Sequence, residues 1–137
     1  MHFITDRKRA TGLGASGSGT TRHWRLTVTS VALVALVVFF VFSFGFALGM
    51  PYEEAAAFYG RPFPAIVALL TFVVGMYHFR LGSQVMIEDY AGGATRHWLV
   101  IGAICLAYLL LAIGAFSVIA LAVRPLIVPA APLVLPA

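Results

Sequence analysis

The sequence contains little charge and almost no cysteine. Only 10% of its 137 residues are charged, five of them acidic, and Cys105 is the single cysteine. One thiol can form neither a disulfide within the chain nor a cysteine-based metal cluster, so the sequence excludes both for this chain alone. Because Cys105 lies inside an apolar stretch, we expect it to serve packing only.

Hydrophobic residues dominate instead, making up 61% of the sequence and giving a mean hydropathy of +0.97. Three apolar stretches, residues 26–49, 63–87 and 98–123, are each long enough to cross a hydrocarbon layer about 30 Å thick. We therefore predict an all-α integral membrane protein with three transmembrane helices and no soluble domain. A net charge of +4 would suggest nucleic acid as the partner of a soluble protein, but here we expect lipid and no nucleic acid.

The few charges are unevenly distributed along the chain. Five basic residues precede the first apolar stretch: Arg7, Lys8, Arg9, Arg22 and Arg25. The first connection between stretches has only Arg61 to set against Glu53 and Glu54. By the positive-inside rule we expect the N-terminus to be cytoplasmic. Three crossings then place the C-terminus outside.

The segments around the three stretches predict little regular structure. Residues 1–25 are basic and rich in Gly and Ser, so we expect them not to fold alone. They also lack the apolar core of a signal peptide, so we expect the first stretch to be retained as a helix. Residues 52–61 predict a short outer loop with solvated glutamates, and residues 124–137 predict a proline-rich tail that is no regular helix.

His78 is the most informative polar residue, because it follows the apolar residues 65–77 directly. A histidine at that membrane depth is costly and needs a partner. On a helix, Gly82 lies one turn away on the same face, where the missing side chain lets a flat group approach. Asp89 returns near that face about 16 Å further along the axis, with Tyr90 beside it. The pattern suits a buried cofactor below an interfacial ligand; a histidine hydrogen-bonded to a neighbouring helix is the alternative.

Two motifs in this stretch resemble a known family. They are His78-Phe-Arg-Leu-Gly82 and Val85-Met-Ile-Glu-Asp-Tyr90, and their residue types and spacing are similar to those of the smaller hydrophobic anchor subunit of succinate dehydrogenase, respiratory complex II. The glycine-rich residues 11–20 resemble the leader of bacterial anchors of this type. The resemblance implies half of a two-subunit helical anchor bundle in the bacterial cytoplasmic membrane.

The resemblance also implies the ligands and the partners. A b-type haem is shared between two anchor subunits, with His78 as the axial iron ligand from this chain, beside Gly82, and the second ligand from the partner. Tyr90 donates a hydrogen bond to a membrane quinone, with Asp89 next to it. The chain is then not catalytic by itself, because succinate is oxidised on a flavoprotein subunit and electrons reach the quinone through an iron–sulfur subunit. Such heterotetramers associate further into trimers.

The entrance to the first helix departs from the family pattern, because Thr27 stands where an arginine is expected. Arg25, or Arg22 from a turn below, is a candidate to contact the haem propionates instead. Arg80, two positions after His78, is a further candidate. The alternative for Arg25 is a charge that extends to the membrane interface without binding a ligand.

Two other interpretations of the whole chain stay open. An anchor of quinol:fumarate reductase uses the same chemistry in reverse, and these residues do not set the direction. A small helical transporter or scaffold protein without haem would use His78 in a polar contact between helices.

Overall fold

The computed structural model describes residues 5–11 and 18–127, and every regular element within them is a helix. In chain order the helices are α1 (Asp6–Thr11), α2 (Ser18–Ala47), α3 (Tyr52–Tyr59), α4 (Pro62–Tyr90) and α5 (Gly93–Ile127). Three segments, Gly19–Ala47, Pro62–Tyr90 and Gly93–Arg124, are long and apolar enough to cross a membrane. The predicted all-α membrane fold with three spanning helices is confirmed.

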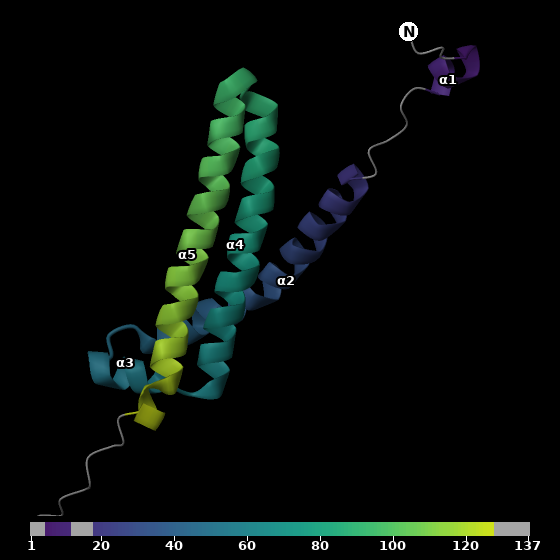
Figure 1. The fold of residues 1–137 in the computed structure, drawn as a ribbon. Helices are drawn as coiled ribbons and strands as arrows, with labels where there is room; N and C mark the ends of the chain where they lie inside the picture. The colour runs from purple at the N-terminus through teal and green to yellow at the C-terminus, as the bar shows by residue number, and fades with distance from the viewer. Residues whose placement is uncertain (1–4, 12–17, 128–137) are drawn as a thin grey trace, which may run out of the picture.

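Helix α4 lies at the centre of the arrangement. Figure 1 shows α4 and α5 as a long antiparallel pair, with α2 crossing this pair obliquely. Most contacts between elements are made by α4, first with α5 and then with α2, while the short α3 packs near the end of α5. The helix that carries the candidate site is thus supported on two sides by its own chain.

The long helices extend further than the apolar stretches alone indicate. Helix α2 begins at Ser18, so the polar residues before the first stretch are already helical. Helix α4 continues to Tyr90, and only Ala91 and Gly92 separate it from α5, which starts at Gly93 with a φ of 59°. Hydropathy marks the part of a helix inside the hydrocarbon, whereas backbone hydrogen bonding propagates the helix beyond it.

Two of the predicted flanking segments fall partly outside the described residues. These parts are residues 12–17 of the glycine-rich leader and residues 128–137 of the proline-rich tail. The tail was expected to begin at Arg124, but α5 includes Arg124 and ends at Ile127. The cost of nucleating a helix is already met by the long α5, so the helix extends past Pro125 although this residue donates no backbone hydrogen bond.

The predicted outer loop is a helix over most of its length, α3. Its centre is a run of three alanines, the strongest helix formers, and Glu53 and Glu54 lie in the first turn, where negative charge favours a helix. Arg124 of α5 forms an ion pair with Glu53, at 2.9 Å between Nη2 and Oε2, and its guanidinium lies 5.6 Å from the ring centre of Tyr52. These contacts join α3 to the end of α5, and the Glu53 side chain remains 73% exposed, as predicted for a solvated glutamate.

Small residues let α4 and α5 approach closely. Ala107 of α5 is only 1% exposed, and a side chain at Gly114 would place its Cβ 2.6 Å from Cδ1 of Phe72 on α4. Cys105, by contrast, is exposed and does not fill the core of this chain. Close packing of small residues takes the place that hydrophobic burial has in a soluble protein.

The contact at Gly114 gives a first prediction. Gly114→Ala should lower the free energy of unfolding by about 1–3 kcal/mol, because the new methyl group displaces the Phe72 ring. Gly102→Ala is the matched control, since a Cβ at Gly102 meets no atom of this chain within 4 Å. Thermal unfolding of the purified complex measures both. Equal stability of the two variants would show that the ring moves aside freely.

Candidate cofactor and quinone site

The His78 side chain lies half-buried between α4 and α2. Its Nδ1 is 2.9 Å from the hydroxyl oxygen of Thr29, a residue of α2 that the sequence did not single out. The same hydroxyl is 2.9 Å from the backbone oxygens of Arg25 and Leu26. One ring nitrogen of His78 therefore has a partner on a neighbouring helix, and this contact leaves the other nitrogen, Nε2, available to a ligand.

Gly82 provides open space one turn from His78. Beyond the adjacent backbone of α4, a Cβ built at Gly82 would meet no heavy atom of the described residues within 4 Å, although Gly82 is half-buried. Any larger residue would fill the space that a planar group needs in order to reach the helix backbone. The predicted pairing of an imidazole with an open backbone surface is thus present on α4.

All three predicted arginines, Arg22, Arg25 and Arg80, line one cleft of about 330 Å³ between α2 and α4. Arg25 is exposed at this cleft and has no ion-pair partner within the described residues. The guanidinium of Arg80 lies 5.7 Å from the ring centre of Tyr108 on α5. Its Nε is buried without a hydrogen-bond partner among the described residues. Arg25 is therefore freer to bind a ligand than Arg80, because the Arg80 side chain is directed towards α5.

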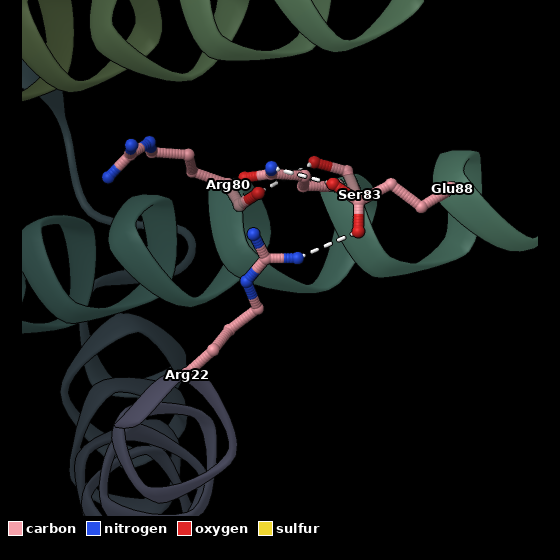
Figure 2. Close-up of polar contacts among 5 residues, drawn as sticks. Arg22, Arg80, Ser83 and Glu88 are labelled. Carbon is pink, nitrogen blue, oxygen red and sulfur yellow. Dashed lines mark hydrogen bonds and ion pairs between the residues drawn. The ribbon is translucent and has the colours of Figure 1, made fainter. Parts of the chain in front are cut away.

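An ion pair joins α2 to the end of α4 beside this cleft. Arg22 Nη1 lies 2.7 Å from Glu88 Oε2, and Figure 2 shows Arg22 reaching across from α2 while Arg80 points away from the pair. Gln84 donates a second hydrogen bond to Glu88 Oε1 at 2.8 Å. The spacing of Gln84 and Glu88 could have indicated their contact, but nothing local points to Arg22, 66 positions away.

A double-mutant cycle tests this ion pair. Arg22→Gln and Glu88→Gln should each destabilise the complex, with a coupling energy of about 1 kcal/mol between them, because both side chains are only partly exposed, 37% and 26%. Glu54→Gln is the control, as Glu54 is an exposed glutamate without an ion pair in the described part of the chain. Unfolding of the purified complex provides the measurement, and additive effects would contradict the contact.

Asp89 and Tyr90 end α4 at the same side of the membrane as this ion pair. Tyr90 is 90% exposed, Asp89 is also exposed, and the phenol of Tyr90 makes no hydrogen bond to another described residue. Both lie on the same continuous helix as His78, as the sequence predicts. This chain alone thus presents the two polar groups but does not enclose them.

Other polar residues near this end stand apart from His78. Thr27, at the position where an arginine was expected, is exposed and donates its hydroxyl proton to the backbone oxygen of His23. His97 is exposed on α5, with its Nδ1 3.1 Å from the backbone oxygen of Gly93. Neither residue contacts His78. Among the described residues, Thr29 is the one whose side chain lies within hydrogen-bond distance of the His78 ring.

Comparison with known proteins identifies the family of the chain. The family model described as succinate dehydrogenase/fumarate reductase transmembrane subunit matches residues 1–122. The chain is 39% identical over 117 residues to the succinate dehydrogenase hydrophobic membrane anchor subunit of Paracoccus denitrificans, covering 85% of this chain and 91% of that protein. No solved structure matches significantly. The chain therefore belongs to the succinate dehydrogenase/fumarate reductase transmembrane subunit family, as a smaller hydrophobic membrane anchor.

Proposed function

We propose that this chain anchors a succinate:quinone oxidoreductase in the membrane, holds one side of a b-type haem through His78, and contributes Tyr90 and Asp89 to the site of quinone reduction. The observation that carries the proposal is the arrangement on α4. A half-buried imidazole lies one turn from an open glycine backbone, and exposed polar groups end the same helix. A transporter or scaffold has no need for this combination.

The residues present fit a haem. His78 would hold the iron through Nε2, since its Nδ1 contacts Thr29. The open backbone at Gly82 accommodates the edge of a planar ring, and Arg25 at the cleft between α2 and α4 is suited to a propionate. Arg80, directed towards Tyr108, is the weaker candidate for that contact. Bound haem would supply a one-electron carrier within the membrane.

Six-coordinate haem needs a second axial ligand, and the other histidines of the described chain are exposed near the membrane surface. We assign that ligand to a second anchor subunit packed against the exposed sides of α2 and α4. Only 6% of the apolar core of the α2 span is buried within this chain, which leaves a large surface for such a partner.

The exposed end of α4 is suited to a quinone. The Tyr90 phenol can donate a hydrogen bond to a quinone carbonyl without placing a fixed charge in an apolar pocket. Asp89 beside it can accept a hydrogen bond, orient a cationic neighbour or relay a proton. Because both side chains are exposed here, the remaining walls of the pocket would come from the iron–sulfur subunit and the second anchor.

Membership in the family supports the proposed assembly. The flavoprotein subunit would oxidise succinate, the iron–sulfur subunit would pass electrons to the quinone, and the heterotetramers would associate as trimers. The basic residues before the first apolar stretch favour a cytoplasmic N-terminus and an external C-terminus in a bacterial cytoplasmic membrane. Fumarate reductase, which the family description also includes, would use the same site in the opposite direction.

A reduced-minus-oxidised difference spectrum of the purified complex tests the haem. We expect the absorption bands of a low-spin bis-histidine b-type haem, together with succinate-dependent quinone reduction. A complex that purifies with its flavoprotein and iron–sulfur subunits but gives no haem bands would refute the cofactor assignment. It would leave the anchoring role intact.

A further inference from the structure

We infer that Thr29 is a positioning residue for His78: its hydroxyl oxygen accepts a hydrogen bond from Nδ1–H, which fixes the ring tautomer and turns an unprotonated Nε2 towards the ligand. The inference rests on the proposed role of His78 as a haem ligand. It adds a residue of another helix, α2, to the site residues on α4.

The tautomer follows from counting protons at the hydroxyl. Thr29 Oγ1 lies 2.9 Å from three groups, namely the backbone oxygens of Arg25 and Leu26 and the Nδ1 of His78. A hydroxyl has one proton, and the two backbone oxygens can only accept it. If that proton went to Nδ1, the hydroxyl oxygen would face two carbonyl oxygens at 2.9 Å with no hydrogen between them. The favourable assignment therefore has Thr29 donating to its own helix and Nδ1–H donating to Thr29.

The same contact restricts the orientation of the ring. The Thr29 hydroxyl is held by the backbone of α2, so its lone pair points in a fixed direction across to α4. The imidazole rotates about two side-chain bonds, and one hydrogen bond at Nδ1 selects among those rotations. A metal-ligating histidine whose second nitrogen donates to an oxygen is also more basic, which favours ferric over ferrous iron.

Thr29→Val tests the contact, because valine keeps the branched shape and removes the oxygen. We expect the purified complex to retain haem with a raised midpoint potential. The ratio of ferric to ferrous affinity should fall by up to about tenfold, which corresponds to about 59 mV for one electron. The low-spin electron paramagnetic resonance spectrum should change too, since it depends on the orientation of the axial imidazole planes. Thr29→Ser, which keeps the hydroxyl, should restore both properties.

Thr27→Val is the matched control for an effect of the substitution itself. Thr27 lies on the same helix, and its hydroxyl is bonded only to the backbone oxygen of His23. Its replacement should leave the midpoint potential and the resonance spectrum unchanged. If Thr29→Val does not assemble, Thr29→Ala and Thr29→Ser can be compared instead, since these variants differ only by the hydroxyl.

The outcomes separate this inference from the proposed function. In one outcome, His78→Ala loses the haem, but the midpoint potential and the resonance spectrum do not change in Thr29→Val, or do not differ between Thr29→Ala and Thr29→Ser. The positioning role of Thr29 is then wrong, and the assignment of His78 as the ligand stands. If His78→Ala keeps a normal bis-histidine haem, the ligand assignment itself is wrong. A raised potential in both Thr29→Val and Thr27→Val would also overturn the positioning role, because the effect would not come from the His78 contact.

Discussion

Replacing His78 with alanine is expected to reduce the haem content of the purified complex to less than about a tenth of the wild-type ratio. Without His78 this chain would supply no axial ligand to the iron, and the haem would depend on the ligand of the second anchor subunit alone. Haem per flavin, measured from the pyridine haemochrome and flavin absorption, provides the readout.

The control for His78→Ala is His97→Ala. His97 is exposed at the start of α5, and its Nδ1 lies near a backbone oxygen of its own helix. Its removal should leave the haem content unchanged. A His78→Ala complex with a full complement of bis-histidine haem would show that the axial ligand comes from elsewhere, and the role of Gly82 would be withdrawn with it.

Tyr90→Phe is expected to slow succinate-dependent quinone reduction by about tenfold to a hundredfold, while succinate oxidation with an artificial acceptor continues. The change removes one hydroxyl, and a hydrogen bond to a developing charge on a quinone oxygen contributes about 1.5–3 kcal/mol. Steady-state assays with the two acceptors, on the same preparation, separate the quinone step from the flavoprotein step.

Tyr52→Phe provides the same chemical change at the opposite end of the bundle. Tyr52 is 71% exposed, and phenylalanine keeps the ring that lies beside Arg124. It should have no effect on either assay. If Tyr90→Phe also has no effect, the phenol of Tyr90 acts only as an interface anchor, and Asp89 becomes the remaining candidate on this chain.

The fold was largely predictable because membrane insertion depends on composition over long windows. Three apolar stretches in the sequence correspond to three helices long and apolar enough to span a membrane. The helix ends and α3 were not predictable in this way. Hydropathy says nothing about backbone order outside the hydrocarbon. The short segment that forms α3 was therefore predicted to be a loop.

The candidate site was predictable only along α4. Helical periodicity relates His78, Gly82 and Asp89 to one another, since all three lie on one element. The contacts of Thr29 with His78 and of Arg22 with Glu88 join residues 49 and 66 positions apart. Such contacts depend on how α2 is rotated against α4, which local periodicity does not determine. For the same reason the approach of Arg80 to Tyr108 was missed.

The unbroken course of α4 from Pro62 to Tyr90 also has an evolutionary consequence. Adding or deleting one residue after His78 would shift the end of the helix by only about 1.5 Å but turn it by about 100°. The phenol of Tyr90 would then point away from its present face of α4, although the amino-acid composition had hardly changed. Many residues between His78 and Tyr90 can therefore be substituted during evolution, but the number of residues between the two must be preserved.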